Sequence, residues 1–169
     1  LAEAIECDLL LLLVDVGDPI AEIDRKLQTS LRELAERVLE SDHASIMERI
    51  QLVLTKADTP NQSSIDSAIE MVGTHGFINP IVISSHTGTG VEELRTTMLH
   101  SLFGPQKSVV LHPGKQGEPA IEALLSRLFD TVYVHGHQRD KTVIEAQISA
   151  SDETLAILQA TYGERIELK

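Results

Sequence analysis

Apolar and polar residues follow a repeated strand–helix order along the first hundred residues. Three short apolar segments predict buried strands of the kind found in parallel sheets, at residues 8–16, 50–55 and 80–84. After each one, apolar residues recur every three or four positions, which predicts amphipathic helices over residues 20–38, 63–72 and 91–102. Strand and helix repeated three times predict an α/β unit with right-handed crossovers.

The pattern changes after the Gly-Pro breaker at residues 104–105. Strands are expected at residues 109–111, 131–137, 142–149 and 166–168, with a polar turn at 138–140 and helices that open at Pro119 and Ser151. The order βαββαβ predicts a small ferredoxin-like α+β domain. Residues 1–104 and 105–169 are therefore expected to form two domains.

Capping residues mark the expected helix ends. Asp18 precedes Pro19, an arrangement that predicts an N-cap for the first helix, and Ser63 with Asp66 resembles a capping box for the second. Ser151 is expected to cap the last helix and Gly163 to end it.

Composition narrows the class of protein. The 169 residues carry 14 Lys+Arg and 26 Asp+Glu, a net charge of −12, which argues against nonspecific nucleic-acid binding. One cysteine excludes a disulfide framework, and the apolar run Leu9–Val14 is far too short to span a membrane. We expect a soluble, cytoplasmic protein, and the first residue, Leu1, suggests a piece of a longer chain.

A four-residue motif, Thr55-Lys56-Ala57-Asp58, follows the second expected strand. A carboxylate at the carboxyl end of a parallel strand lies where open α/β sheets bind ligands. Asp58 could accept hydrogen bonds from the ring N–H and the exocyclic amine of guanine, a donor pair that adenine lacks on that edge. Lys56 could lay its methylene groups over the base. The alternative is an ordinary polar loop.

A second motif follows the next strand, where residues 84–90 read Ser-Ser-His-Thr-Gly-Thr-Gly before a helix. Backbone N–H groups of such a tight turn could face the oxygen of the base. An ordinary glycine-containing loop is again the alternative, but two neighbouring strand ends with the expected loops favour a base-binding site.

Together these motifs resemble the carboxyl-terminal half of a Ras-like GTPase domain, over residues 1–103. Thr55-Lys56-Ala57-Asp58 looks like the guanine-specificity box, usually Asn-Lys-x-Asp, and Ser84-Ser85-His86 looks like the Ser-Ala-Lys box. The resemblance implies that Asp58 reads guanine, that Lys56 stacks on the base, and that Ser85 and His86 offer backbone N–H groups to the guanine oxygen. Thr55 replaces the usual Asn and His86 the usual Lys.

A closer resemblance is to the HflX family of translational GTPases. It rests on the opening AEAIECDLLLLLVDVGDP at residues 2–19, the long helix that follows, and the small domain beginning near Val-Val-Leu-His-Pro at residues 109–113. It implies binding of GTP and GDP, Mg²⁺, and association with the large ribosomal subunit.

The 169 residues contain no G-x-x-x-x-G-K-[ST] phosphate loop. The resemblance therefore implies that GTP hydrolysis and Mg²⁺ binding belong to an intact parent, and this chain alone is expected to be inactive. Two alternatives stay open: a non-catalytic interaction module, and a fragment of another Ras-like ribosome-assembly GTPase.

In a Ras-like sheet the strand at residues 8–16 is central and pairs with the phosphate-loop strand. Without that partner its edge is apolar and open, so the sequence predicts self-association through Leu9–Val14. His135 and His137 could form a metal-binding pair with His112 nearby, but a solvated strand end at a hairpin explains them better.

Overall fold

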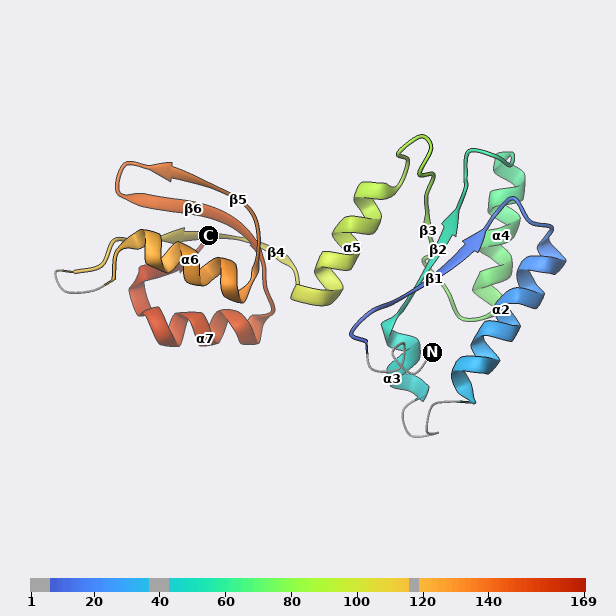
Figure 1. Cartoon of the computed structure of the whole chain (residues 1–169), viewed down its shortest axis with the longest axis horizontal. Helices are drawn as coiled ribbons and strands as arrows, with labels where there is room; N and C mark the ends of the chain where they lie inside the picture. Colours follow the sequence, from blue (N-terminus) through green and yellow to red (C-terminus); the bar gives the residue numbers. More distant parts are fainter. Residues whose placement is uncertain (1–6, 37–42, 116–118) are drawn as a thin grey trace. The chain divides into compact units, whose positions relative to one another are not determined.

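The computed structural model describes residues 7–36, 43–115 and 119–169 (Figure 1). The chain divides into two compact units, Leu1–Thr96 and Thr97–Lys169. The division falls inside α5 (Val91–Phe103), whereas the boundary expected from the sequence follows that helix. None of the described helices is long and apolar enough to cross a membrane.

The first unit is built on a parallel sheet, as the sequence predicted. Its strands are β1 (Leu10–Asp15), β2 (Ile50–Thr55) and β3 (Ile81–Val82), in the order β1-β2-β3. The helices are α2 (Ile20–Ala35), the short α3 (His43–Arg49), which was not predicted, and α4 (Gln62–Thr74). The part of the expected first helix beyond residue 36 lies outside the described residues.

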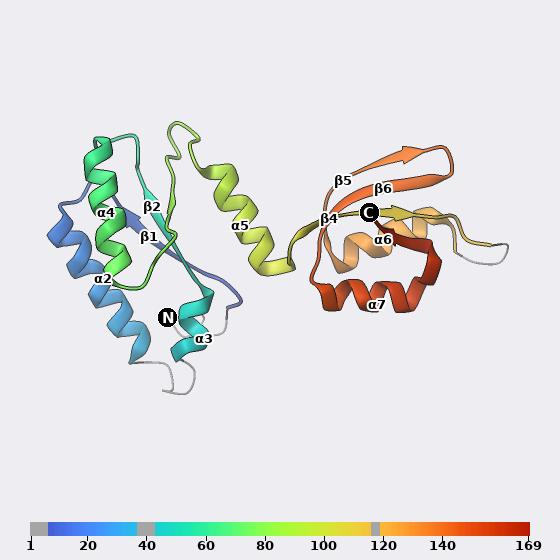
Figure 2. The same ribbon diagram turned by 180° about the vertical axis from the view of Figure 1, so that it is seen from behind.

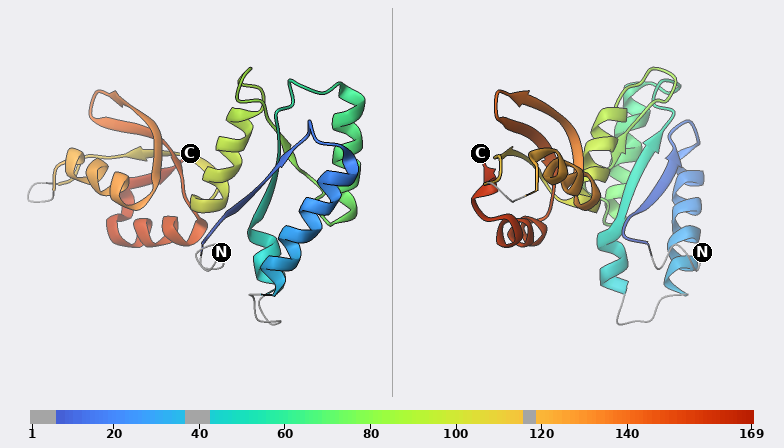
Figure 3. Two further views of the ribbon diagram at one scale, coloured as in Figure 1. Left: turned by 45° about the vertical axis from the view of Figure 1, so that its right-hand side comes forward. Right: turned by 60° about the vertical axis from the view of Figure 1, so that its left-hand side comes forward.

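One core lies between this sheet and the helices α2 and α4 (Figure 3). The even-numbered residues of β1 and β2 pack against apolar stripes on both helices, formed by Ile23, Leu27, Leu34, Ile65, Ala68 and Val72. The opposite face of β1 is less covered, and Leu13 is 62% exposed. The expectation that this strand is buried on both faces is therefore wrong.

Two expected caps are also wrong. The side chain of Asn61, not Ser63, accepts a hydrogen bond from the N–H of Ser64, so α4 begins at Gln62. Pro19 occupies the N-cap position of α2, while the Asp18 carboxylate binds Lys26 at 2.7 Å instead of capping the helix. Asp18 thus forms an ion pair with a lysine about two helical turns further along the chain and does not cap the helix N-terminus. Local sequence rules for capping do not take such a partner into account.

The second unit is an antiparallel sheet with two helices. Its elements are β4 (Gln106–Leu111), α6 (Ile121–Thr131), β5 (Tyr133–Asp140), β6 (Val143–Ser149), α7 (Asp152–Tyr162) and β7 (Ile166–Leu168). The sheet order is β5-β6-β4-β7, and Figure 2 shows β5, β6 and β4 with both helices. Alternate residues of β4 and β6 form one core with both helices, through Val109, Leu111, Ile144, Ile148, Leu124, Leu128, Leu155 and Leu158.

The ends of α7 follow the prediction, but the hairpin does not. The Ser151 hydroxyl accepts from the N–H of Thr154, and Gly163 follows the helix with φ 56°. The expected turn at residues 138–140 is part of β5, and the chain turns at Lys141 and Thr142. Lys141 adopts the positive φ, 52°, that the hairpin needs at this point. The polar residues 138–140 therefore lie at the solvated end of β5 and do not form the turn.

Candidate functional site

The loops that follow β2 and β3 lie side by side at the carboxyl edge of the parallel sheet. The N–H of Ala57 donates to the Ile83 carbonyl at 3.1 Å, and the N–H of Ile83 donates to the Leu54 carbonyl at 2.8 Å. Two motifs that are 26 residues apart in sequence, at Asp58 and Ser84, therefore meet in space. Parallel neighbours bring their carboxyl ends together in this way, at the edge where α/β sheets bind ligands.

Asp58 and Ser84 are joined directly. The Ser84 hydroxyl, which is 1% exposed, donates to Oδ1 of Asp58 at 2.5 Å and accepts from the N–H of Thr87 at 3.1 Å. This hydrogen bond is the main cause that lowers the pKa of Asp58, and the nearby His86 contributes in the same direction. Asp58 is thus an exposed, ionised carboxylate whose position is fixed by a buried hydroxyl.

The loop after β3 is closed by its own hydrogen bonds. The N–H of Ser84 donates to the Thr89 carbonyl at 3.0 Å, and the N–H of Gly88 donates to the Ser84 carbonyl at 2.8 Å. These bonds bend the chain away from the strand, which is why β3 ends at Val82 and not at Ser84 as expected.

Ser85 and His86 lie exposed at the tip of this loop. Their backbone N–H groups make no hydrogen bond to any residue that the structure describes. Two backbone donors next to an ionised carboxylate form a site with both acceptor and donor character. Such a site matches a planar ligand that presents N–H groups and a carbonyl on neighbouring positions.

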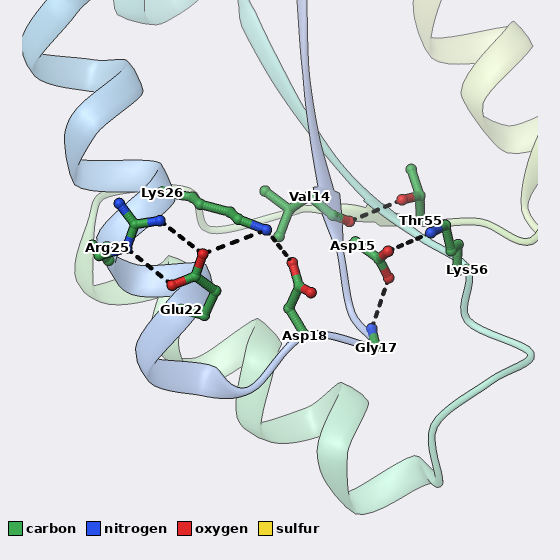
Figure 4. Close-up of polar contacts among 9 residues, drawn as sticks. All are labelled: Val14, Asp15, Gly17, Asp18, Glu22, Arg25, Lys26, Thr55 and Lys56. Carbon is green, nitrogen blue, oxygen red and sulfur yellow. Dashed lines mark hydrogen bonds and ion pairs between the residues drawn. The ribbon is translucent and has the colours of Figure 1, made fainter.

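Lys56 is held by a different carboxylate (Figure 4). Its Nζ lies 2.5 Å from Oδ2 of Asp15, whose other oxygen accepts from the N–H of Gly17 at 2.9 Å. The lysine lowers the pKa of Asp15, and Asp15 in turn raises the pKa of Lys56. The lysine side chain is 65% exposed, so this ion pair is screened by water and orients the ammonium more than it stabilises the fold.

The pairing of Lys56 with Asp15 was not predicted, because the sequence placed Asp15 inside the expected strand at residues 8–16 and gave Lys56 a role at the base. Register explains it: Asp15 lies opposite Thr55 in the β1–β2 ladder, so Lys56, the first residue after β2, passes beside the carboxylate. Thr55 itself links the two strands, since its hydroxyl donates to the Val14 carbonyl at 3.1 Å (Figure 4). A search of the sequence for polar residues at the ends of neighbouring strands could have paired Asp15 with Lys56.

A second group of charges lies at the start of α2, formed by Asp18 before the helix and by Glu22, Arg25 and Lys26 on it (Figure 4). Lys26 binds Asp18 at 2.7 Å and lies 3.6 Å from Glu22, which also binds Arg25 at 2.7 Å. All four side chains have an internal partner. We assign them to the solvated surface of the helix, where such pairs contribute little to stability.

The histidines weighed as metal ligands have separate partners. His135 hydrogen-bonds to the Ser149 hydroxyl at 2.9 Å, His137 packs edge-on against Phe129, and His112 lies 3.0 Å from Glu167. Across residues 7–36, 43–115 and 119–169 no group of three His, Cys, Asp or Glu side chains is arranged to hold a metal ion.

The structure thus brings Asp58, Ser84, Ser85 and His86 together, and places Thr55 and Lys56 on the side facing β1. No protein-family model matches this chain, and no curated protein matches it.

Proposed function

We propose that the loops after β2 and β3 bind the base of a guanine nucleotide, with Asp58 as the residue that selects guanine. The observation that carries the proposal is the hydrogen bond from the buried Ser84 hydroxyl to the exposed Asp58 carboxylate. Fixing a carboxylate before the ligand arrives lowers the entropy lost on binding.

Hydrogen-bond chemistry favours guanine over adenine. A carboxylate accepts from the ring N–H and the exocyclic amine of guanine together, while the N–H groups of Ser85 and His86 can donate to its carbonyl oxygen. Adenine presents an unprotonated ring nitrogen at the corresponding position, which would leave the Asp58 carboxylate unpaired. A site built to pair with specific donors rejects an analogue that lacks them.

The wider assignment is a Ras-like GTPase of the HflX class, acting in the cytoplasm at the large ribosomal subunit. It is supported by the parallel order β1-β2-β3 with the two motifs at one edge, and by an antiparallel unit whose βαββαβ order and strand order β5-β6-β4-β7 suit a ferredoxin-like domain. In this proposal the described residues bind and orient the base. Phosphate binding, Mg²⁺ and hydrolysis belong to parts of the parent outside these 169 residues.

Asp58→Asn tests the proposal by changing which base is bound. Asparagine loses one acceptor and gains an N–H donor, so guanine affinity is expected to fall about tenfold or more. Xanthine carries a carbonyl in place of the guanine amine, and its nucleotide should gain affinity in the variant. The measurement is an equilibrium titration with fluorescent guanine, xanthine and adenine nucleotides.

Asp66→Asn is the matched control. It removes the same charge from the surface of α4, where Asp66 accepts from Gln62, and it should leave base selectivity unchanged. Equal binding of guanine and adenine nucleotides by the native chain, or guanine affinity that survives Asp58→Asn, would refute the proposal and favour an interaction module.

A further inference from the structure

The side chain of Lys56 is held at both of its ends. At the backbone, Lys56 has φ 60°, and its carbonyl accepts from the N–H of Thr59 at 3.1 Å, which closes a turn directly after β2. At the other end, the Nζ atom lies 2.5 Å from Oδ2 of Asp15, at the end of β1. The methylene groups of the lysine therefore span from the end of one strand to the end of its neighbour (Figure 4).

Asp15 is in turn held by the loop that follows β1. Its Oδ1 atom accepts from the N–H of Gly17 at 2.9 Å, and its carbonyl accepts from the N–H of Asp18 at 3.2 Å. A Cβ added at Gly17 would lie 3.1 Å from Oδ1, so the loop passes close to the carboxylate. The hydrogen bonds from Lys56 and Gly17 lower the pKa of Asp15, which keeps it charged near neutral pH. Each carboxylate oxygen thus has a partner, and the direction of the side chain is defined.

Lys56 and Asp58 are two residues apart, but they bind partners that follow different strands. Lys56 binds Asp15 at the end of β1, whereas Asp58 binds Ser84 in the loop after β3. The carboxyl edge of the sheet therefore carries groups that can pair with the edge of a base on the side of β3, and the methylene groups of a lysine on the side of β1. A base that is paired by its edge leaves two flat faces, and lysine methylene groups offer an apolar surface to one of them.

The ion pair with Asp15 is compatible with a contact between Lys56 and a nucleotide. An ammonium has three N–H donors, and binding one carboxylate oxygen uses one of them. An exposed lysine without such a partner moves among many rotamers and loses that freedom when a ligand orders it. The side chain of Lys56 is 65% exposed, so its methylene groups are accessible to a ligand while its ammonium is already oriented.

We propose that Asp15 is a positioning residue of the base site, which holds the methylene groups of Lys56 as a surface for one face of the bound purine. The inference rests on the function proposed above, and it adds a residue that acts through the lysine without touching the base. The faces of guanine, xanthine and adenine are chemically alike, so contact with them raises affinity without selecting among the bases. Asp58 therefore determines which base binds, and Asp15 contributes to how tightly it binds.

Asp15→Ala releases the lysine and should lower guanine-nucleotide affinity about three- to tenfold, because one long side chain must then be ordered on binding. In the Asp58→Asn background, which is expected to favour xanthine, the same substitution should lower xanthine-nucleotide affinity by the same factor. Asp15→Glu restores the carboxylate and should recover part of the loss. The measurement is an equilibrium titration with fluorescent guanine and xanthine nucleotides.

Two further variants separate positioning from a structural role of Asp15. Asp18→Ala is the matched control, since it removes a neighbouring carboxylate that binds Lys26, and it should leave nucleotide affinity unchanged. In Lys56→Met, which keeps an apolar side chain without the ammonium, Asp15→Ala should lower affinity no further. Equal losses in Asp15→Ala and Asp18→Ala would overturn the proposal. So would a change in base selectivity caused by Asp15→Ala, or a loss that persists in the Lys56→Met background.

Nuclear magnetic resonance relaxation of ¹³C-labelled lysine gives a readout that needs no nucleotide. We expect the methylene groups of Lys56 to be restricted in the native chain and in Asp18→Ala, and mobile in Asp15→Ala. Equal mobility in the native chain and in Asp15→Ala would show that Asp15 does not position the lysine, even where guanine binds. A restricted lysine in a native chain that binds no guanine nucleotide would instead refute the proposed function, and the role of Asp15 at a base with it.

Discussion

Replacing Gly90 by alanine is expected to destabilise the parallel-sheet unit by about 2 to 5 kcal/mol, the sum of left-handed backbone strain and steric overlap. Gly90 has φ +71°, and a Cβ added there would lie 2.0 Å from the Val82 carbonyl oxygen. That oxygen belongs to the backbone of β3, so it cannot move aside without breaking the strand. The displaced loop would also carry Ser84 away from Asp58, and guanine affinity should fall with stability.

Gly88 provides the control within the same loop. It also has a positive φ, +80°, but an added Cβ meets nothing within 4 Å. Gly88→Ala should therefore cost only the backbone strain, about 1 to 2 kcal/mol. Urea unfolding followed by circular dichroism measures both variants, and equal losses for Gly90→Ala and Gly88→Ala would contradict the close approach at Gly90.

Gly104→Ala is expected to have an effect of similar size, about 2 to 5 kcal/mol, on the antiparallel unit. Gly104 has φ +99°, and its added Cβ would lie 2.6 Å from the Ser151 nitrogen and 2.7 Å from the carbonyl of Ala150. The overlap would push the segment before β4 away from the start of α7, where the Ser151 cap forms.

Gly163→Ala is the control for the antiparallel unit, because it introduces the backbone strain of a positive φ without a steric overlap. Gly163 has φ +56° with nothing within 4 Å of an added Cβ, so its substitution should lower stability by about 1 to 2 kcal/mol. Thermal unfolding of the two variants against the native chain gives the comparison. A Gly104→Ala protein that melts at or above the temperature of Gly163→Ala would show that the contact with residues 150 and 151 is wrong.

The sequence predicted the fold where periodicity and burial act together. The expected strand at residues 50–55 has the bounds of β2, and the one expected at 142–149 matches β6, whose buried face is formed by Ile144, Ala146 and Ile148. Local rules failed where a distant residue decides the outcome. Asp18 forms an ion pair with Lys26 and does not cap the helix. β3 is shorter than expected because the loop that follows it is closed by the hydrogen bond between Ser84 and Thr89.

The sequence predicted which residues form the candidate site, but not which of their side chains bind one another. The motifs pointed to Asp58 and to the turn at Ser84, because both follow strands that end at one edge of the sheet. The role of the Ser84 side chain as a support for Asp58, and that of Asp15 as the partner of Lys56, depend on distances between loops that are far apart in sequence. Those distances follow from strand register, which a single sequence does not define.

The most direct test of guanine recognition is a nuclear magnetic resonance titration of the ¹⁵N-labelled chain with a guanine nucleotide and, separately, an adenine nucleotide. Shift changes report weak binding, so the absence of a phosphate loop from these 169 residues does not mask the result. We expect the amide signals of Asp58, Ser85 and His86 to shift in a saturable way with the guanine nucleotide and to stay in place with the adenine nucleotide. Identical responses to both nucleotides, or no response of these amides at millimolar guanine nucleotide, would contradict a guanine-binding site at these loops.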